Sequence, residues 1–230
     1  MRWSYPSRPA VVLGSTQRPS DIDEVRAASA GLEVVRRGTG GGAVLVRPGE
    51  QVWLDVWLPR GDPLWSDDVV RSAGWIGSLW AGALRDMGVD DVRVHSGRLS
   101  RSEWSDVVCF AGVGPGEVLA GNAKIVGVAQ RRSREGAHFH TMAPLRWDPT
   151  ALMEVMVSPP GVPQSGSLSG NELQDVATGL CNIVPLLRAI RSEAESPSNF
   201  GSPDISGSPE VSIASAMQVA LTTGLASIPA

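Results

Sequence analysis

An apolar stripe with helical spacing runs from Asp68 to Met87. Apolar side chains recur every three or four residues and would share one face of a helix, at Val69, Ala73, Ile76, Trp80, Ala83 and Met87. Polar residues at 66–68 are suited to cap the first turn, and Gly88 stands where a glycine commonly ends a helix. The pattern therefore predicts an amphipathic helix over residues 68–87.

A period of two marks the segment from Val52 to Leu58. Apolar residues at the even positions alternate with Trp53, Asp55 and Trp57, and alternate side chains of a strand point to opposite faces. The segment is predicted to be a strand with one buried face. Shorter apolar runs predict further strands at residues 11–13, 32–35, 43–46, 92–95, 107–110, 117–119 and 124–129. With helices predicted over residues 21–30 and 171–195, the fold class is α+β, or mixed α/β.

The end of the chain has a different composition. From Ser196 to Ala230, 15 of 35 residues are Ser, Gly or Pro. Such a segment buries too little apolar surface to offset the entropy lost on ordering, so the tail is predicted to be largely disordered. Helical spacing over Val211 to Leu225 leaves room for a loosely docked helix there. We therefore divide the chain into a domain at residues 1–195 and a tail at residues 196–230.

Length and charge exclude several classes of protein. A chain of 230 residues with 42% hydrophobic and 19% charged residues has the composition of one sizeable globular domain. A net charge of −4 argues against a nucleic-acid partner. No apolar run is long enough to predict a membrane span, no signal peptide is recognisable, and two cysteines are too few for a disulfide-rich secreted scaffold. The expected location is the cytoplasm.

Lys124 is the single lysine among 20 basic residues. It can be a chance exception in an arginine-rich sequence or an exposed edge-strand lysine. It can also mark a position that needs a compact ammonium, which a planar guanidinium cannot imitate. A lysine at the start of a strand can stabilise negative charge that develops on a carbonyl or phosphate oxygen. Gly127 in the same strand would let a ligand or another backbone come close.

A glycine triplet, Gly40 to Gly42, lies between two predicted strands and follows Arg36 and Arg37. Its N–H groups could converge on an anion or a carbonyl, with the arginines supplying fixed positive charge. The alternative is a flexible hairpin turn with solvated arginines. The loop matches neither a Walker loop nor a dinucleotide-binding fingerprint.

Cys109 and two histidines complete the candidate reactive groups. A lone cysteine after two valines is commonly a buried small side chain, so a structural role and a nucleophilic role both stay open for Cys109. His138 and His140 would face the same side of a strand, where one of them could act as a base. No third cysteine, histidine or carboxylate stands at a spacing typical of a metal site, so we predict no metal centre.

In their order and separation, these segments resemble the lipoate–protein ligase and octanoyltransferase superfamily, which also contains biotin–protein ligases. The family pattern of two arginines, a short spacer and a glycine triplet is matched by Arg36 to Val44. An apolar strand that ends in glycine and is followed by glutamine is matched by Val12 to Gln17. The lysine motif of the family is matched by Lys124 to Arg132. The resemblance implies a biotin/lipoate ligase-like catalytic domain over residues 1–195, with mainly antiparallel mixed sheets packed against helices.

The resemblance also implies roles for individual residues. The glycine loop would line a tunnel for a medium-length acyl chain, and Lys124 would contact the acyl carbonyl or the phosphate of an acyl-adenylate. Substrate-binding positions carry over to Arg36, Arg37, Gly40, Gly41, Gly42, Ala43, Gly127, Ala129 and His140. The implied acceptor is a lysine of a small lipoyl carrier domain. Such domains are typically acidic, which would suit the cluster of Arg131, Arg132 and Arg134.

Two chemistries divide this superfamily. Transferases carry the acyl group on a cysteine, with an acyl carrier protein as donor and no cofactor, whereas ligases activate a free acid with ATP and Mg²⁺. One transferase branch has a Cys-Phe pair before the lysine, and Cys109-Phe110 matches it, 15 residues before Lys124. We therefore expect Cys109 and Lys124 to be the catalytic pair that transfers an octanoyl or lipoyl group. The alternatives are an ATP-dependent ligase and a divergent, non-catalytic protein that binds a ligand or a carrier domain.

The chain departs from the family pattern in three places. Leu45 to Glu50 stands where the family has an aromatic residue followed by His and an acidic residue. Phe139 to Thr141 stands where many members have Gln-His-Gly. Family domains begin with a helix and a strand upstream of the segment near Trp3, so either the true start of the protein lies upstream of Met1 or the domain lacks this N-terminal helix. The first two departures leave the acyl donor and the detailed mechanism open.

Overall fold

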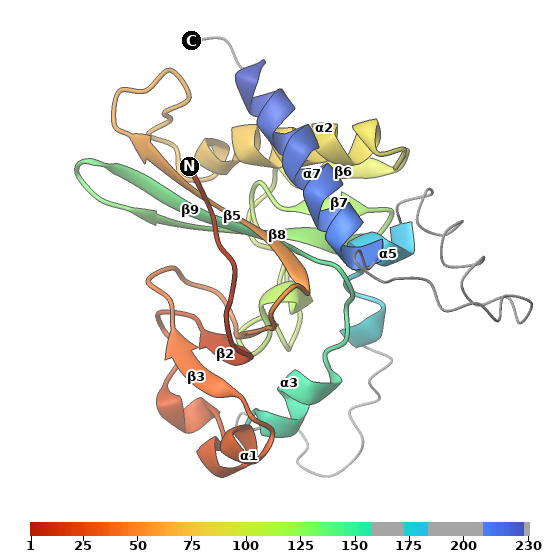
Figure 1. The fold of residues 1–230 in the computed structure, drawn as a ribbon. Helices are drawn as coiled ribbons and strands as arrows, with labels where there is room; N and C mark the ends of the chain where they lie inside the picture. Colours follow the sequence, from red (N-terminus) through yellow and green to blue (C-terminus); the bar gives the residue numbers. More distant parts are fainter. Residues whose placement is uncertain (158–172, 184–208, 228–230) are drawn as a thin grey trace, which may run out of the picture.

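The computed structural model describes residues 1–157, 173–183 and 209–227. Two β-sheets lie between two groups of helices (Figure 1). The larger sheet has six strands, all antiparallel to their neighbours, in the order β1 (Arg2–Trp3), β5 (Gln51–Pro59), β9 (Gly136–Pro144), β8 (Ala123–Arg132), β7 (Val118–Ala120) and β6 (Val92–Val94). The smaller sheet has the order β3 (Glu33–Arg36), β2 (Ala10–Leu13) and β4 (Val44–Val46).

The alternation predicted for residues 52–58 decides which face of the large sheet is which. Val52, Leu54, Val56 and Leu58 of β5 are buried in the main core cluster. The intervening positions Trp53 and Asp55 are paired with Met142 and His140 of β9. Because directly paired residues share a face of a sheet, this second face carries Trp53, Asp55, Met142 and His140 toward the smaller sheet.

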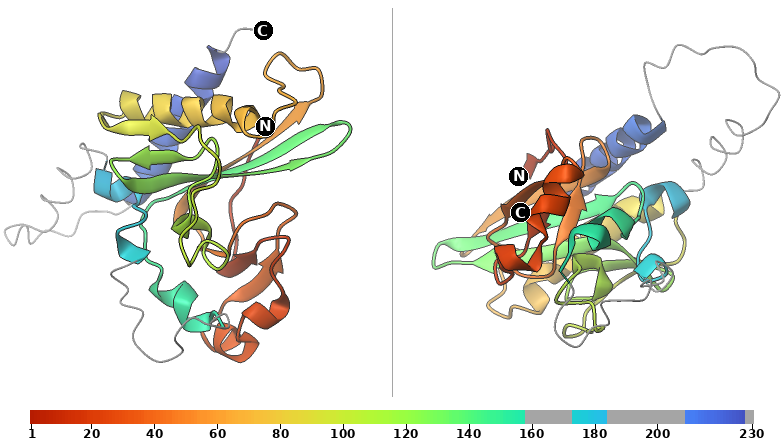
Figure 2. Two further views of the ribbon diagram at one scale, coloured as in Figure 1. Left: turned by 180° about the vertical axis from the view of Figure 1, so that it is seen from behind. Right: turned by 90° about the horizontal axis from the view of Figure 1, so that it is seen from below.

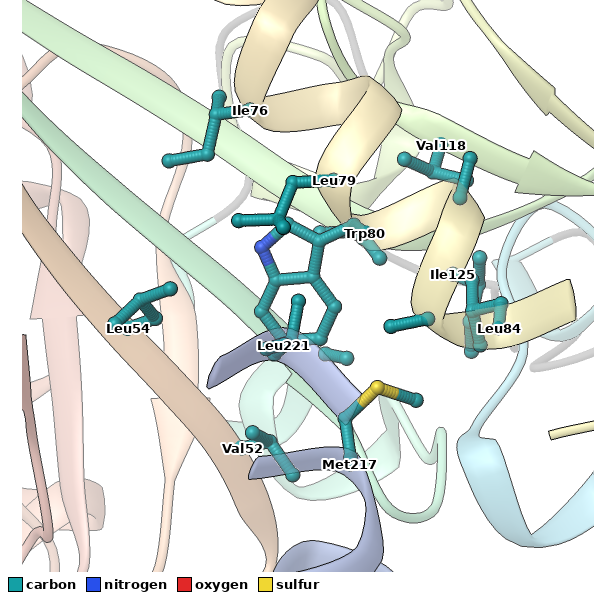
Figure 3. Close-up of a cluster of buried hydrophobic side chains, with 14 of the residues drawn as sticks. Val52, Leu54, Ile76, Leu79, Trp80, Leu84, Val118, Ile125, Met217 and Leu221 are labelled. Atoms are coloured by element: carbon teal, nitrogen blue, oxygen red, sulfur yellow. The ribbon is translucent and has the colours of Figure 1, made fainter. Parts of the chain in front are cut away.

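Helices α2 (Gly74–Asp86) and α7 (Pro209–Ala226) cover the first face of the large sheet (Figure 1). Trp80 of α2 is fully buried at the centre of this layer, beside Leu54 of β5 and Leu221 of α7 (Figure 3). The Trp80 indole N–H donates to the hydroxyl of Thr141 at 2.9 Å. The large ring is therefore buried without leaving its one polar group unpaired.

The small sheet packs between the large sheet and helices α1 (Glu24–Ser29) and α3 (Thr150–Val155), which lie at the far end of the molecule (Figure 2). Alternate residues of β2 lie on the two opposite faces of the small sheet. Val11 and Leu13 pack in the cluster that includes α1 and α3. Val12 packs with Phe110 and Met142 in the layer between the two sheets. The candidate site lies in this layer, since β4 and β9 meet there.

Most predicted elements are present, with shifted ends. The helix predicted over residues 68–87 begins with a 3-10 turn, Arg71–Ala73, and becomes α-helical at Gly74. The helix predicted over residues 21–30 is the shorter α1, whose first turn is capped by Asp23. Of the helix predicted over residues 171–195, the described part holds α5 (Leu180–Ile183), and residues 184–195 lie outside the described ranges.

One predicted strand is wrong. Residues 107–110 do not extend a sheet: Val108 makes an isolated parallel bridge with Ala43, and Cys109–Ala111 form a 3-10 turn, η3. The apolar run is explained by burial, because Val107, Val108 and Phe110 are all buried. A short apolar run cannot by itself distinguish a buried turn from a buried strand.

The tail is partly ordered. Helix α7 includes the residues from Val211 to Leu225 for which helical spacing was noted, and Met217 and Leu221 are fully buried in the main core. This part of the tail is therefore helical and docked rather than disordered, while residues 196–208 lie outside the described ranges. The boundary at residue 195 stays a prediction. None of the helices in the described ranges is long and apolar enough to cross a membrane.

Candidate functional site

The glycine triplet forms a tight loop against the end of β2. Gly41 has a φ of +94°, a backbone conformation that favours glycine. A Cβ on Gly14, the residue after β2, would overlap the carbonyl oxygen of Gly41. Glycine is therefore required on both sides of this contact.

Arg37 holds the loop from within. Its guanidinium donates to the carbonyl oxygens of Val12, Gly40 and Gly42 at 3.0, 2.8 and 2.8 Å. One of its nitrogens also lies 3.9 Å from the sulfur of Cys109. Arg37 thus shapes the loop and places a fixed positive charge near the thiol. Arg36, the last residue of β3, is exposed and does not line either of the cavities described below.

The loop is fastened to the segment that carries Cys109. The Ala43 N–H donates to Val107 at 2.7 Å, and the Cys109 N–H donates to Ala43 at 2.9 Å. A Cβ on Gly42 would stand 2.6 Å from backbone atoms of Val108. The predicted site residue Ala43 therefore acts through its backbone, and its side chain is buried away from the cavity.

Gln17 makes a second connection between the same two segments. Its side-chain oxygen accepts from the Gly14 N–H at 2.9 Å. Its side-chain nitrogen donates to the carbonyl oxygens of Asp106 and Val107, at 3.2 Å each. The glutamine of the predicted motif therefore ties the end of β2 to the chain that leads into Cys109.

Lys124 is buried with 1% of its surface exposed, so it is not an exposed edge-strand lysine. Its ammonium donates to the carbonyl oxygens of Cys109 and Gly112 at 2.8 and 2.9 Å. It also lies 2.7 Å from a carboxylate oxygen of Glu117, which is buried as well. An ammonium has three N–H donors, and these three partners engage all of them. Lys124 thus holds the turn that carries Cys109.

These groups surround one cavity of about 550 Å³. The glycine loop lines it on one side and Lys124 on another, and Cys109 and Ala129 also line it. Six of the predicted site residues, on segments far apart in the chain, are therefore brought together at this cavity: Gly40, Gly41, Gly42, Cys109, Lys124 and Ala129.

A smaller, apolar slot of about 30 Å³ adjoins this cavity, since Cys109, Val128 and Ala129 line both. The predicted residues Arg37, Gly127 and His140 line the slot, together with Trp53, Phe110 and Met142. Gly127 faces the Phe110 ring, where a Cβ would make an ordinary contact of 3.5 Å. Cys109 therefore stands between a large cavity and an apolar slot.

A hydrogen-bonded cluster centred on Asp55 lies beside the slot. One carboxylate oxygen accepts from Nδ1 of His140 at 2.5 Å and from Nε1 of Trp53 at 2.9 Å. The other accepts from the Ser4 hydroxyl at 2.5 Å and from Arg2 at 3.2 Å. Burial acts to raise the pKa of Asp55, but the hydrogen bonds from His140, Ser4 and Trp53 outweigh burial and hold this pKa well below its usual value.

The neighbouring ring of His138 has a different environment. Its centroid lies 4.4 Å from that of His140. Burial, and then the nearby His140, lower the pKa of His138. His138 pairs with Trp57 of β5, two residues along each strand from the Asp55–His140 pair. His138 does not line the slot.

Asp55, His138 and His140 bring three potential metal-ligand atoms within 4.8 Å of one another. Nδ1 of His140 already contacts Asp55 at hydrogen-bond distance, and the remaining capacity of the carboxylate is used by Trp53, Ser4 and Arg2. Two ligands of one zinc ion, each about 2.0–2.2 Å from it in a tetrahedral site, would lie farther apart than 2.5 Å. We interpret this cluster as a hydrogen-bonded pair with neighbours rather than as a metal centre.

Sequence reasoning missed Asp55 and Glu117 as site residues. Asp55 stood out only as a charged residue in an alternating strand, and its partner is fixed by the β5–β9 register. Glu117 was assigned to a short strand, yet it pairs with Lys124 across a β-bulge between β7 and β8. An unexplained carboxylate among apolar residues was the available signal in both cases.

Comparison with known proteins identifies the family of the domain. Residues 2–191 match the model of the lipoyl protein ligase A/B catalytic domain. An octanoyltransferase, LipM, of Moorella thermoacetica is 34% identical over 128 residues, which are 55% of this chain and 46% of that protein. The chain thus aligns with about half the length of this curated relative.

Solved structures share the fold. A bipartite lipoate protein ligase from Thermoplasma acidophilum, described with its E2 lipoyl domain, has a TM-score of 0.65 at 18% identity over 98% of this chain and 70% of that one. A lipoate-protein ligase A bound with ATP has a TM-score of 0.60 at 17% identity over 95% of this chain and 70% of that one. These matches confirm the predicted mixed α+β architecture. Because the family model spans most of the sequence, the chain belongs to the lipoyl protein ligase A/B catalytic domain family.

Proposed function

We propose that this protein transfers an octanoyl or lipoyl group to a lysine of a lipoyl carrier domain through a thioester on Cys109. One observation carries the proposal: Cys109 stands where the cavity bounded by the glycine loop and Lys124 meets an apolar slot. The thiol is thus next to apolar side chains that an acyl chain would contact and next to a larger cavity open to a donor.

The chemistry at Cys109 is a pair of acyl transfers. In the first, the Cys109 thiolate attacks the thioester carbonyl of an acylated carrier protein. A new C–S bond forms, the C–S bond to the carrier breaks, and the carrier leaves as a thiolate that takes up the proton lost from Cys109. The guanidinium of Arg37 lies 3.9 Å from the sulfur and places a fixed positive charge beside the attacking group. In the second, the lysine amine of the acceptor attacks the Cys109 thioester, and the amide forms as the C–S bond breaks.

We assign Lys124 to the same machinery. Its ammonium fixes the carbonyl of Cys109 and therefore the position of the thiol. Its buried charge would also lie near the thioester carbonyl, on whose oxygen negative charge develops during each transfer, and such a preorganised charge lowers the energy of the tetrahedral state. Direct contact of Lys124 with the substrate would require exchange of one of its three present partners.

The relatives support the acyl group and the acceptor by analogy. The Moorella relative is named an octanoyltransferase, and the Thermoplasma ligase is described with a lipoyl domain. Arg131, whose guanidinium reaches the start of the glycine loop at Gly38, would face an acidic carrier domain docked there.

Intact-mass analysis with octanoylated acyl carrier protein tests the proposal. We expect a covalent octanoyl adduct on the wild-type chain and on Cys181→Ala, which removes the other cysteine, and none on Cys109→Ser. Transfer of the octanoyl group to the lipoyl domain should fall in the variant that forms no adduct. An adduct that persists on Cys109→Ser, or turnover lowered by less than about threefold, would contradict the thioester.

One observation favours a second candidate, an ATP-dependent ligase. The cavity of about 550 Å³ falls in the range of about 300–1,000 Å³ that holds drug-sized ligands, and it is larger than an acyl chain needs. A ligase would convert ATP to AMP only with free lipoate present and would retain this activity in Cys109→Ser. If the protein binds the carrier domain without forming product, and Lys124→Ala does not change that binding, both enzyme activities are excluded.

A further inference from the structure

The apolar slot contains a histidine whose orientation is fixed. His140 lines the slot with Cys109, and its Nδ1 contacts Asp55 at 2.5 Å. Asp55 is 4% exposed and comes from the neighbouring strand, directly opposite His140 in the β5–β9 register. A buried carboxylate that accepts several hydrogen bonds is a rigid partner for a ring.

The cluster around Asp55 also sets the tautomer of His140. An ionised carboxylate only accepts hydrogen bonds, so Nδ1 of His140 must carry the proton that joins the two groups. Nε2 is then the ring nitrogen with a lone pair. Trp53, Ser4 and Arg2 share the remaining capacity of the carboxylate and keep it from turning away.

We propose that His140 is the base that removes a proton from the acceptor lysine beside the Cys109 thioester, and that Asp55 is the residue that positions it. The inference rests on the proposed function, since it concerns the second of the two acyl transfers. It adds a proton acceptor to that step and gives Asp55 a role.

In this step one C–N bond forms, one C–S bond breaks, and two protons leave the lysine nitrogen. The acceptor lysine arrives as an ammonium, because its ordinary pKa is about 10.4. Nε2 of His140 takes one proton, and the free amine attacks the thioester carbonyl. The C–N bond forms, the C–S bond breaks, and the second amine proton passes to the departing sulfur. The products are the amide, the Cys109 thiol and an imidazolium that returns its proton to solvent.

Other groups near the slot are less suited to this task. The Lys124 ammonium is engaged with three partners, and the Arg37 guanidinium has only donors, which bind carbonyl oxygens of the glycine loop and of Val12. Cys109 carries the acyl group at this stage. His138 lies outside the slot, and its partner across the strand is Trp57 rather than a carboxylate. Among the described residues that line the slot, His140 is therefore the one base available to an incoming amine.

The test measures the second transfer alone. Cys109 is loaded with octanoylated acyl carrier protein, the donor is removed, and discharge onto a lipoyl domain is followed by intact mass. Near neutral pH we expect His140→Gln and Asp55→Asn to slow discharge by about 10²- to 10⁴-fold, the usual worth of a general base. Each variant is compared with the wild type after loading to the same extent, so that a change in the first transfer does not enter the measured discharge rate. His138→Gln is the matched control and should discharge like the wild type.

The pH profile separates proton transfer from simple loss of structure. The defect of His140→Gln should shrink as the pH approaches about 10.4, because solvent then deprotonates the amine. The charged or titratable groups around His140 are Asp55 on β5, His138 on its own strand, Arg2 on β1, and Arg37 and Cys109 across the slot. His140→Gln leaves all of these groups in place, so a pH-dependent defect in this variant is assigned to the loss of the imidazole. Circular dichroism melting checks the fold of each variant.

The outcomes are distinguishable. If the wild type never takes up the octanoyl group, the proposed function fails and this inference fails with it. If loaded His140→Gln discharges as fast as His138→Gln at every pH, the inference alone is overturned. Discharge that requires added zinc and stops with a chelator would also overturn it, because the cluster would then be a metal site.

Discussion

At the scale of single residues, the buried ion pair of Lys124 and Glu117 decides how the site is held. The carboxylate of Glu117 accepts from Lys124 at 2.7 Å and from the backbone N–H groups of Gly114 and Val128 at 2.7 and 3.1 Å. Both side chains are almost fully buried. A buried pair of this kind adds little net stability, but the loss of one partner leaves an uncompensated charge.

We therefore predict that Lys124→Met destabilises the protein by about 3–5 kcal/mol. The double variant Lys124→Met/Glu117→Gln should recover much of that loss, because no unpaired charge remains. Both variants should lack transfer activity. Urea unfolding curves measure the stabilities, and a double variant as unstable as the single one would contradict a charge-pairing role.

The glycine loop offers a comparison between neighbouring positions. A Cβ on Gly42 would meet the backbone of Val108 at 2.6 Å and the Cys109 nitrogen at 2.8 Å, whereas a Cβ on Gly40 would meet nothing within 4 Å. We predict that Gly42→Ala costs several kcal/mol and displaces the Cys109 turn, while Gly40→Ala stays within about 0.5 kcal/mol of the wild type. Thermal melts of the two variants check this prediction. Equal losses of stability would contradict the close contact between Gly42 and the Cys109 turn.

Asp55 and His138 give the protein a defined response to acid. Both have a pKa below the ordinary value, so the unfolded chain takes up each proton first as the pH falls. The free energy of unfolding should therefore fall below about pH 6.5 through His138 and further below about pH 4 through Asp55. Urea titrations at several pH values measure this free energy. His138→Gln should reduce its fall below about pH 6.5, and Asp55→Asn should reduce its fall below about pH 4. An unchanged acid slope in Asp55→Asn would contradict the role of its hydrogen bonds.

At the scale of elements, the local hydrophobic pattern was sufficient to predict a helix or a strand where one face of the element is buried. The periods of β5 and α2 were clear because one side of each packs on the main core. The strand β1 is two residues long and the helix α3 six, and neither leaves a periodic signal. The turn η3 was read as a strand because tertiary burial, rather than a sheet, explains its apolar residues.

The site was predictable to the extent that it is carried by local motifs. The glycine loop, Lys124 and Cys109 lie in recognisable segments, and the structure brings them to one cavity. The partners that orient them are set by register: Asp55 meets His140 through β5–β9 pairing, and Glu117 meets Lys124 across a bulge. Register depends on the complete sheet, so a single sequence does not reveal those pairs.

Helix α7 shows that a segment with weak amphipathic character can still form part of the core. Leu221 is fully buried against α2 and β5, while Val219, two residues earlier, is 66% exposed. We predict that Leu221→Ala costs about 2–5 kcal/mol and that Val219→Ala changes stability by less than about 0.5 kcal/mol. Thermal unfolding measures both, and a Leu221→Ala variant as stable as Val219→Ala would show that α7 does not dock in solution.

At the scale of the whole molecule, the two sheets form the walls of the site and the charge distribution decides what can approach it. The net charge of the chain is −4. An acidic carrier domain would therefore be repelled by the molecule as a whole. Arginines lie locally at the β8–β9 hairpin beside the glycine loop, where Arg131 is exposed and Arg132 is bound to the carbonyl oxygen of Ser66.

The local charge should therefore guide docking without forming part of the chemistry. We predict that Arg131→Ala raises the KM for the lipoyl domain several-fold at low ionic strength and leaves kcat nearly unchanged, because exposed charges mainly affect encounter. The effect should diminish toward 0.15 M salt, where screening acts over about 8 Å. Arg93→Ala makes the same charge change on β6, at the opposite edge of the large sheet from β1, and serves as the control. Steady-state kinetics at two salt concentrations measure both variants. Equal effects of the two substitutions would mean that net charge alone governs the approach, and a loss confined to kcat would place Arg131 in the reaction rather than at its entrance.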